Sequence, residues 1–445
     1  MEDGKMVREI GADGIVYLGV AKSMKQGDNR VAVPPQYVST LKPAAWNNGR
    51  DRTKLEVLVE EGAGLRVGYD DDAYVRAGAQ IVTKSELLDR SHILVDVKQR
   101  PEEGVLQDGI NIFYLHVEKG QGIPQLNALV QRGGVTAYSP ETIWVPEREN
   151  PQNLVRGVNL AYYSGIGGAH LALEGIKLSY QSRGITPVPF EFLPQIDGAT
   201  QEQMNEAYKQ IGDLEKSMRI AIIGGPRGMV SSGAQDELKK AGLSPDLIYK
   251  NVTSNQETLA SVIGQYDAII NGSLWIPGQP RMITKRQILA VKEGAVFMDD
   301  TCDPDFSSTQ ETEGEPIRGG VRYSFESKWG DKNMHYWVGP ETHTFDAENP
   351  REFLPGEVRV LYNAVGMIPG GTTTACAASE AYFGMIFPYL TSIIRAVSQG
   401  TELPEQGLVV KDGKIIHKGN GITEKVGLRD LVQTRDDLAQ FRKYL

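Results

Sequence analysis

Apolar and polar positions alternate along the first 120 residues in a pattern that predicts strands separated by short helices. Between the strands, the pattern predicts a helix that begins after a proline pair, an acid-capped helix over residues 69–79 that ends at glycine, and a helix over residues 84–89. The apolar runs, which are typical of buried parallel strands, lie at residues 15–20, 55–59, 81–82, 93–97 and 112–115. This β-α-β order predicts an α/β fold with a parallel sheet and right-handed crossovers.

The second half of the chain repeats the alternation after a different kind of segment. An alanine- and glycine-rich helical pattern fills most of residues 154–178, and we interpret residues 161–217 as a connecting helix and an excursion between domains. From Arg219 onward, a strand, a glycine-rich turn and a helix begin a nucleotide-binding series. We therefore expect two Rossmann-like domains with parallel sheets. One is a discontinuous catalytic domain of residues 1–160 and 366–445, and the other is a dinucleotide-binding domain of residues 218–365.

Composition narrows the classes of function. The net charge of −10 and the pI near 5.3 argue against nucleic-acid and anionic-membrane partners. The two cysteines, Cys302 and Cys376, are too few for a disulfide framework or a cysteine-based metal site. The chain lacks an apolar run of transmembrane length and its first residues lack a signal-peptide core. We therefore expect a cytoplasmic enzyme with small-molecule partners, for which a homodimer is compatible with the sequence.

Two residues that can exchange protons follow neighbouring apolar runs. Lys98 ends the run that begins at Ile93, and His116 ends the run that begins at Ile112. The carboxyl ends of parallel strands are where open α/β sheets bind their ligands. A lysine with a lowered pKa and a histidine can both transfer protons near neutral pH. Taken alone, the two residues are more often a solvated lysine and a core histidine, so other features must decide.

The strongest local motif is the glycine-rich turn after the strand that begins at Arg219. Its spacing, Gly224-x-x-x-Gly228-x-x-x-x-Gly233, departs from G-x-G-x-x-G, but a strand precedes it and a helix follows. Glycines let backbone N–H groups approach a pyrophosphate at a helix N-terminus. We therefore favour dinucleotide binding over a purely structural turn, with Ser231 and Ser232 as further phosphate contacts.

The residues after the next strand bear on the choice of cofactor. NAD sites usually carry an acidic residue there, whereas a 2′-phosphate needs a cation. The stretch from Ile248 to Ser254 has no acidic residue, and it contains Lys250 and Asn251. Arg227 in the glycine-rich turn is a second candidate for the phosphate. We therefore favour NADP(H) over NAD(H).

A group of carboxylates follows the apolar strand at residues 295–298. Asp299, Asp300 and Asp303 surround Cys302, so at least one carboxylate is expected at the carboxyl edge near the nicotinamide. The histidines and cysteines lack ligand spacing, and we expect no metal site. Cys302 has no evident base partner in the sequence and is interpreted as a small buried residue.

The ordered motifs resemble the alanine dehydrogenase and saccharopine dehydrogenase superfamily over nearly the full chain. The resemblance is strongest to the lysine-forming saccharopine dehydrogenases, in particular to the lysine–ketoglutarate reductase domain. The extension His116-x-x-Lys119-x-Gln121 favours that group over alanine dehydrogenase. The other matching stretches are Asn29–Ala32, Glu61–Gly64, Ala77–Ala79, Val97–Glu103, Val230–Gln235, Asn271–Trp275, Pro280–Thr284, Ala378–Glu380 and Pro388–Tyr389. The family's Asp-x-Leu-Pro motif is instead Gly366-Met367-Ile368-Pro369. We expect the protein to act without the fused second enzyme of that group.

The resemblance implies an active site in the cleft between the two domains and a role for each matching residue. Lys98 and His116 match the proton-transfer pair, and Asp303 matches the aspartate near the nicotinamide. Arg30 matches the arginine that binds a substrate carboxylate. The remaining matches are substrate-pocket positions at Lys119, Gln121 and Glu141, and a cofactor position at Asn271.

Three hypotheses follow for the function. The first is an NADPH-dependent opine-type dehydrogenase that condenses an amino acid with a 2-oxo acid, with L-lysine and 2-oxoglutarate giving saccharopine. The second is an amino-acid dehydrogenase that uses ammonia, as alanine dehydrogenase does. The third is a nucleotide-binding regulator without catalytic activity, which the presence of Lys98, His116 and Arg30 argues against.

Overall fold

The computed structural model divides the chain into two compact units, and each is described here by itself. Unit 1 comprises Met1–Asn159 and Ala375–Leu445, and unit 2 comprises Leu160–Thr374. The residues that the structure describes are 8, 10–11, 14–25, 28–44, 54–116, 126, 129–130, 135–148, 150–152, 154–196, 199–273, 283–284, 287, 290–300, 309–310, 336–338, 345–346, 360–363 and 373–416. Residues 161–217, which the sequence pattern indicates as a connection between domains, are part of unit 2.

Unit 1 is built on an eight-stranded sheet whose order is β19-β18-β6-β5-β4-β1-β2-β3. Strands β1 to β6 are mutually parallel, whereas β18 and β19 are antiparallel additions. The strands are β1 Ile15–Val20, β2 Lys54–Glu60, β3 Gln80–Val82, β4 Ile93–Lys98, β5 Ile110–Tyr114, β6 Thr136–Tyr138, β18 Leu408–Lys411 and β19 Lys414–Ile415. The first six have the 3-2-1-4-5-6 order of a doubly wound fold, so the expected parallel α/β sheet is confirmed.

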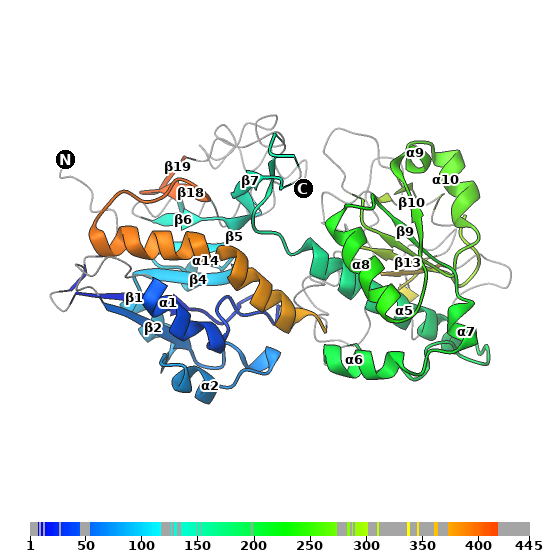
Figure 1. The fold of residues 1–445 in the computed structure, drawn as a ribbon, viewed down its shortest axis with the longest axis horizontal. Helices are drawn as coiled ribbons and strands as arrows, with labels where there is room; N and C mark the ends of the chain where they lie inside the picture. Colours follow the sequence, from blue (N-terminus) through cyan, green and yellow to red (C-terminus); the bar gives the residue numbers. More distant parts are fainter. Residues whose placement is uncertain are drawn as a thin grey trace. The chain divides into compact units, whose positions relative to one another are not determined.

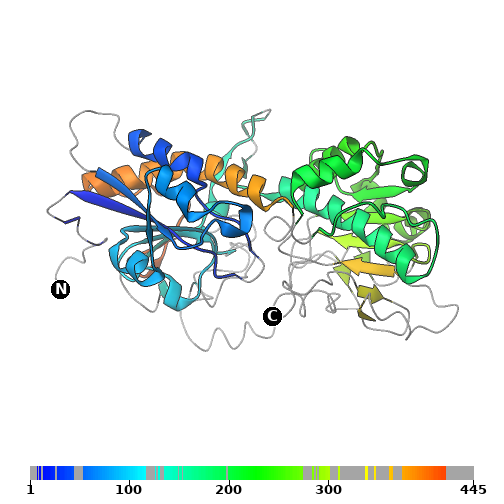
Figure 2. The same ribbon diagram turned by 90° about the horizontal axis from the view of Figure 1, so that it is seen from below.

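The helices of unit 1 begin and end where the sequence supplies caps. Asp70 accepts the Ala73 N–H at the start of α2, and Thr83 and Glu86 form a capping box at the start of α3. The long helix α14 and helix α1 lie on the same face of the sheet in both views (Figures 1 and 2). The helical segments are η1 Pro35–Tyr37, α1 Val38–Ala44, η2 Leu65–Val67, α2 Asp71–Arg76, α3 Lys84–Arg90, η3 Glu102–Gly104, η5 Pro140–Thr142 and α14 Ala375–Gln399, and a separate hairpin pairs β7 Trp144–Pro146 with β8 Leu154–Arg156.

A tight turn joins the antiparallel strands β18 and β19 of this sheet. Asp412 and Gly413 connect β18 to β19, and both have positive φ angles, of 50° and 68°. Positive φ at both central residues is the geometry that favours Asp-Gly in a two-residue hairpin. The Asp-Gly hairpin predicted from the sequence is therefore present.

Unit 2 is built on a second sheet whose order is β10-β9-β11-β13-β17-β15-β16. Strands β10, β9, β11, β13 and β17 are parallel. The chain moves from β9 to β10 on one side and later to β11 on the other side, which creates a switch point between β9 and β11. The strands are β9 Ile220–Ile223, β10 Asp246–Ile248, β11 Ala268–Asn271, β13 Val296–Asp299, β17 Val360–Asn363, β15 Tyr336–Val338 and β16 Phe345–Asp346, with a separate pair of β12 Ile283–Thr284 and β14 Thr309–Gln310.

Helices α5 and α8 pack side by side against the unit 2 sheet (Figures 1 and 2). At their crossing, a Cβ on Gly165 would overlap the Val230 carbonyl oxygen, and a Cβ on Gly233 would overlap the Tyr162 carbonyl oxygen. The helices of this unit are α5 Ala161–Ser182, α6 Gln201–Tyr208, α7 Asp213–Lys216, α8 Met229–Lys240, α9 Lys250–Thr253 and α10 Gln256–Ile263. Small residues therefore let the two helix backbones approach closely. Among the described helices, none is both long and apolar enough to cross a membrane.

Candidate active site

Lys98 and His116 meet at the carboxyl edge of the unit 1 sheet. Lys98 is the last residue of β4 and pairs in register with Tyr114, the last residue of the neighbouring parallel strand β5. The register shifts between Val95 and Lys98, so that β4 contains one extra residue just before the lysine. Such a bulge changes the direction of a side chain at the end of a strand. The Nζ atom of Lys98 lies 2.6 Å from Nε2 of His116, so the structure brings the predicted pair into direct contact.

The other ring nitrogen of His116 faces a carboxylate. Nδ1 lies 2.9 Å from Oε2 of Glu141, and the Glu141 side chain is 2% exposed. A carboxylate opposite Nδ1 favours the tautomer with its proton on Nδ1, which leaves Nε2 as an acceptor for the lysine. The imidazole also stacks on Tyr114 with an interplanar angle of 7°. Glu141, which the family resemblance predicts as a substrate-pocket residue, thus lies behind the histidine.

Arg30 lies in the loop after β1, with its guanidinium buried and held by Asp28. Two contacts join them, from Nε to Oδ1 at 2.8 Å and from Nη2 to Oδ2 at 3.0 Å. Burial lowers the pKa of Arg30, but the Asp28 carboxylate and its hydrogen bond raise it, and the net effect is a raised pKa. The predicted carboxylate-binding arginine is therefore fully charged and held by an acidic partner that the sequence pattern does not identify.

The end of strand β4, which carries Lys98, is fixed by Arg100. Its buried guanidinium donates to the carbonyl oxygens of Gly104 and Lys22, each at 2.7 Å, and to Asp96 Oδ2 at 2.6 Å. Burial raises the pKa of Asp96 to about 6, although the guanidinium opposes this shift. Because Asp96 lies two residues before Lys98 on β4, these contacts hold the end of the strand in place.

In unit 2, the predicted glycine-rich turn lies at the switch point between β9 and β11, the usual location of a dinucleotide in such a sheet. A Cβ on Gly224 would overlap the hydroxyl of Ser231. That hydroxyl is buried and has no hydrogen-bond partner among the described residues. A close backbone approach beside an unsatisfied hydroxyl fits a phosphate oxygen, so these residues suit the predicted cofactor.

The other predicted residues of the turn divide into two groups. Gly228 is the N-cap of α8, and Arg227 is exposed just before it, so both lie at the helix N-terminus where a phosphate is favoured. Ser232 donates its hydroxyl to the Pro226 carbonyl oxygen at 3.4 Å and thereby closes the turn. Gly233 lies in the α5–α8 contact described above. Close helix packing gives this glycine a structural role, and its contact with a cofactor stays a prediction.

The strand ends beside the turn contain the remaining predicted cofactor residues. Helix α9 begins at Lys250, and Asn251 is exposed in it. Asn271 ends β11 and is buried, and its Nδ2 donates to Asp299 Oδ1 at 3.0 Å. Asn271 therefore connects the carboxyl ends of β11 and β13. The described edge also contains Asp300, whereas three predicted site residues, Lys119, Gln121 and Asp303, lie outside the described residues.

Asp300 is an acidic residue with an unusual environment. Ser164 donates to its Oδ1 at 2.7 Å, while its Oδ2 is buried without a partner among the described residues. Burial raises the pKa of Asp300 to about 7, the Ser164 hydrogen bond opposes the shift, and the charge of Asp299 adds to it. The carboxyl group is therefore largely protonated below neutral pH.

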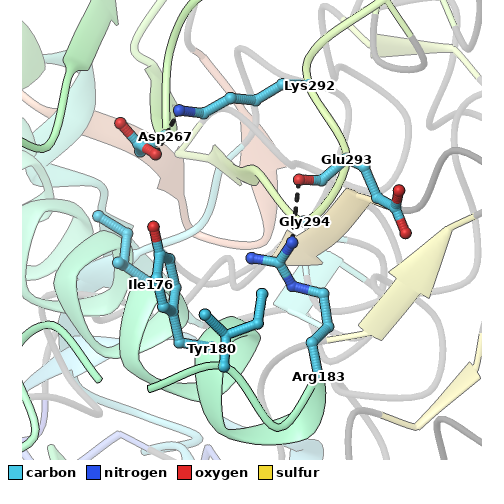
Figure 3. Close-up of a pocket in the computed structure, with 8 residues that line it drawn as sticks. Ile176, Tyr180, Arg183, Asp267, Lys292, Glu293 and Gly294 are labelled. Atoms are coloured by element: carbon cyan, nitrogen blue, oxygen red, sulfur yellow. Dashed lines mark hydrogen bonds and ion pairs between the residues drawn. The ribbon is translucent and has the colours of Figure 1, made fainter. Parts of the chain in front are cut away.

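A cavity of about 220 Å³ lies at the opposite edge of the unit 2 sheet, just before β11 and β13. Two contacts lie among its lining residues: Lys292 pairs with Asp267 at 2.5 Å, and Arg183 donates to the Glu293 carbonyl oxygen at 3.3 Å (Figure 3). None of the predicted site residues lines it. It is therefore not a candidate for the chemistry of the site.

Comparisons with known proteins find similarity to alanine dehydrogenases. Residues 19–157 match the family model described as alanine dehydrogenase/PNT, N-terminal domain. The alanine dehydrogenase of Bacillus subtilis is 26% identical over 291 residues, covering 64% of this chain and 70% of the relative. Alanine dehydrogenase 1 of Staphylococcus aureus is 28% identical over 304 residues, covering 64% and 72%.

Two solved structures share the fold over most of the chain. An L-alanine dehydrogenase has a TM-score of 0.59 at 19% identity, covering 93% of this chain and all (100%) of that one. A transhydrogenase from Sinorhizobium meliloti has a TM-score of 0.57 at 16% identity, covering 90% and 99%. The expected superfamily is thus supported, whereas the predicted closeness to saccharopine dehydrogenase is not shown by these matches. Residues 19–157 are thus similar to the N-terminal domain of the alanine dehydrogenase/PNT family, and the chain shares its fold with an L-alanine dehydrogenase.

Proposed function

We propose that the protein is a nicotinamide-dependent amino-acid dehydrogenase, which interconverts an amino acid with a 2-oxo acid and ammonia. The observation that carries the proposal is the contact of 2.6 Å between Lys98 and His116 at the carboxyl edge of unit 1. The alanine dehydrogenase relatives support the same reaction class. Amination of a 2-oxo acid by ammonia therefore replaces the opine-type reaction as the first hypothesis.

The chemistry needs groups that can move protons beside a carbonyl carbon. In the aminating direction, ammonia attacks the carbonyl carbon of the oxo acid, the carbonyl oxygen takes up two protons and leaves as water, and the imine is reduced. The nicotinamide cofactor, when bound, supplies the hydride. Lys98 is suited to protonate the departing oxygen, and His116 can then return a proton to Lys98 through their direct contact. Glu141 stabilises the imidazolium that forms when His116 is protonated.

Arg30 is proposed to bind the substrate carboxylate. Asp28 occupies Nε and Nη2 of the guanidinium, so the substrate would approach the outer end of the group. An arginine in a fixed orientation suits a planar carboxylate better than a flexible lysine does.

For the cofactor, we propose NADP(H) in preference to NAD(H). The support is the absence of an acidic residue from the segment after β10, Tyr249-Lys250-Asn251, and the exposed Arg227 at the turn. A ribose 2′-phosphate needs a cation at this position, whereas a 2′-hydroxyl needs an acid. Comparing the Kd values of NADPH and NADH for the wild-type chain and for Arg227→Ala tests this choice. A preference for NADH in both proteins would overturn it.

The reaction is tested by following NADPH or NADH oxidation with ammonium and a panel of small 2-oxo acids that includes pyruvate and 2-oxoglutarate. We expect turnover that Lys98→Met nearly abolishes while cofactor binding remains. Lys54→Met, which changes an exposed lysine at the start of β2, is the matched control and should retain activity. Full activity of Lys98→Met would remove Lys98 from the mechanism. If the wild-type protein shows no turnover with any combination of amine and oxo acid, the regulator hypothesis would be favoured.

A second candidate remains because of one sequence feature. The extension His116-x-x-Lys119-x-Gln121 resembles the lysine-forming saccharopine dehydrogenases, which join two amino-acid-sized substrates. Replacing ammonium with L-lysine in the presence of 2-oxoglutarate separates the two reactions. Turnover with lysine and none with ammonium would favour the opine-type reaction.

A further inference from the structure

We propose that Ser139 is a positioning residue that fixes both the backbone before His116 and the carboxylate behind it. The proposal rests on the proposed function, because it places Ser139 in support of the same proton-transfer pair. Ser139 is fully buried and lies directly after β6, the strand next to β5. Its hydroxyl oxygen accepts the Leu115 N–H at 3.0 Å, and its hydroxyl hydrogen points to Oε1 of Glu141 at 3.3 Å.

The first contact restrains a strained backbone. His116 has a φ of 53°, in the left-handed region that a residue with a side chain adopts only at a cost. The paired part of β5 and β6 ends with Ile112 opposite Tyr138, so the amide of Leu115 lies beyond the ladder. The Ser139 hydroxyl gives that amide a buried acceptor and fixes the residue immediately before the strained histidine.

The second contact sets the carboxylate. Glu141 presents Oε2 to His116 and Oε1 to Ser139. A carboxylate held at both oxygens cannot rotate about its last bond without losing one partner, so Nδ1 of the imidazole faces a fixed acceptor. One hydroxyl thus restrains the histidine from its backbone side and from its ring side.

Ser139 can serve as an anchor because its own backbone is held. Its N–H donates to the Gly407 carbonyl oxygen at 2.8 Å, and its carbonyl oxygen accepts the Thr142 N–H at 3.0 Å. Gly407 lies just before β18, in the segment that returns to unit 1. The anchor therefore depends on a contact between residues more than 250 positions apart in the sequence.

The charges around the imidazole stay the same when this hydroxyl is removed. Lys98 and Glu141 face the imidazole. The charges of Arg30 and Arg156 interact electrostatically with Tyr114, whose ring stacks on the imidazole. A change in the pH–rate profile of a Ser139 variant would therefore report orientation and not a lost charge.

The kinetic test compares Ser139→Ala with Thr136→Val. Thr136 lies in the same strand, and its buried hydroxyl has no partner among the described residues, so its loss should leave kcat/KM within about twofold. For Ser139→Ala we expect kcat/KM to fall roughly tenfold, as for loss of a hydrogen bond to a charged group. The limb of the pH–rate profile that is due to the imidazole should move to lower pH, because the imidazolium loses a fixed carboxylate, while the Kd of NADPH stays unchanged.

A second measurement separates this proposal from the proposed reaction. In protein labelled with ¹⁵N-histidine, the Nδ1 proton of His116, assigned with His116→Gln, should shift or disappear in Ser139→Ala and stay in place in Thr136→Val. This readout needs no turnover, so it holds even if the reaction class is wrong. If Ser139→Ala does not fold, Ser139→Cys keeps the volume with a weaker donor and should change both readouts in the same direction. A folded Ser139 variant with an unchanged resonance and an unchanged profile would overturn the proposal.

Discussion

Asp28 and Arg30 form a two-point ion pair across one intervening residue, with Oδ1 to Nε at 2.8 Å and Oδ2 to Nη2 at 3.0 Å. The Asp28 Oδ1 atom also accepts the backbone N–H of Arg30 at 3.1 Å. Both side chains are buried, at 0% and 3% exposure. The pair therefore fixes the guanidinium from within its own loop, and the loop is held in turn by Ser379, whose hydroxyl accepts the Val31 N–H at 3.0 Å.

Replacing Asp28 with asparagine should destabilise the protein, because it leaves a buried guanidinium without its charge partner. Breaking a buried ion pair in this way costs about 3 kcal/mol of the free energy of unfolding. Urea unfolding measures the change. Asp72→Asn, an exposed aspartate in the first turn of α2, is the control and should change the free energy by less than about 0.5 kcal/mol. A loss below about 1 kcal/mol in Asp28→Asn would show that the pair does not hold the loop.

Ser231→Ala should act in opposite directions on stability and on cofactor binding. The Ser231 hydroxyl is buried without a partner among the described residues, so its removal should stabilise the cofactor-free protein by about 1 kcal/mol. If the hydroxyl binds a phosphate oxygen, the Kd of NADPH should rise about tenfold. Thermal unfolding without cofactor and a fluorescence titration measure the two effects. An unchanged Kd would place the phosphates away from Ser231.

Asp300→Asn should change how stability depends on pH. The pKa of Asp300 is raised by burial to about 7, from the ordinary aspartate value of 3.8. Between these two values the folded protein holds a proton that the unfolded chain releases, so the stability of the wild type falls as pH rises from about 4 to 7 and then levels off. The upper limit of the effect is about 4 kcal/mol. Asparagine mimics the protonated acid and cannot ionise.

The measurement is the free energy of unfolding of both proteins at pH 5 and pH 8. The advantage of Asp300→Asn over the wild type should be larger at pH 8 than at pH 5. Asp89→Asn, at an exposed position in α3, supplies the matched comparison. Parallel curves for the wild type and Asp300→Asn would mean that Asp300 is ionised in the folded protein throughout this range.

Two glycine-to-alanine substitutions in helices should have opposite effects. Gly233→Ala would place a Cβ against the Tyr162 carbonyl oxygen, and overpacking of this kind costs about 1–3 kcal/mol. A Cβ on Gly384 in α14 would meet no atom within 4 Å, so Gly384→Ala should be neutral or stabilise by up to about 1 kcal/mol through helix propensity. Differential scanning calorimetry of both variants measures the contrast. Equal Tm values would show that α5 and α8 are not in close contact.

Much of the fold followed from local patterns. The apolar runs at residues 93–97 and 112–115 predicted β4 and β5, which pair in parallel in the structure. Continuous apolar runs indicate such strands because a parallel sheet is buried on both faces. The capped helices and the Asp412-Gly413 turn follow from the chemistry of a few adjacent residues. The meeting of Lys98 with His116 could also be expected, since both lie at the carboxyl ends of strands that are neighbours in a doubly wound sheet.

The sequence by itself determined the fold class, the strand ends that carry the reactive side chains and the glycine-rich turn at a strand–helix junction. Only the tertiary structure decided what surrounds them. Glu141, a predicted substrate-pocket residue, lies behind His116, and Gly233, a predicted cofactor residue, also lies between two helices. Periodicity reports which face of a strand or helix is buried, but a hydrogen bond such as that from Leu115 to Ser139 depends on which strands become neighbours. Packing over the whole sheet decides which strands become neighbours, and this information is not present in the sequence of any one segment.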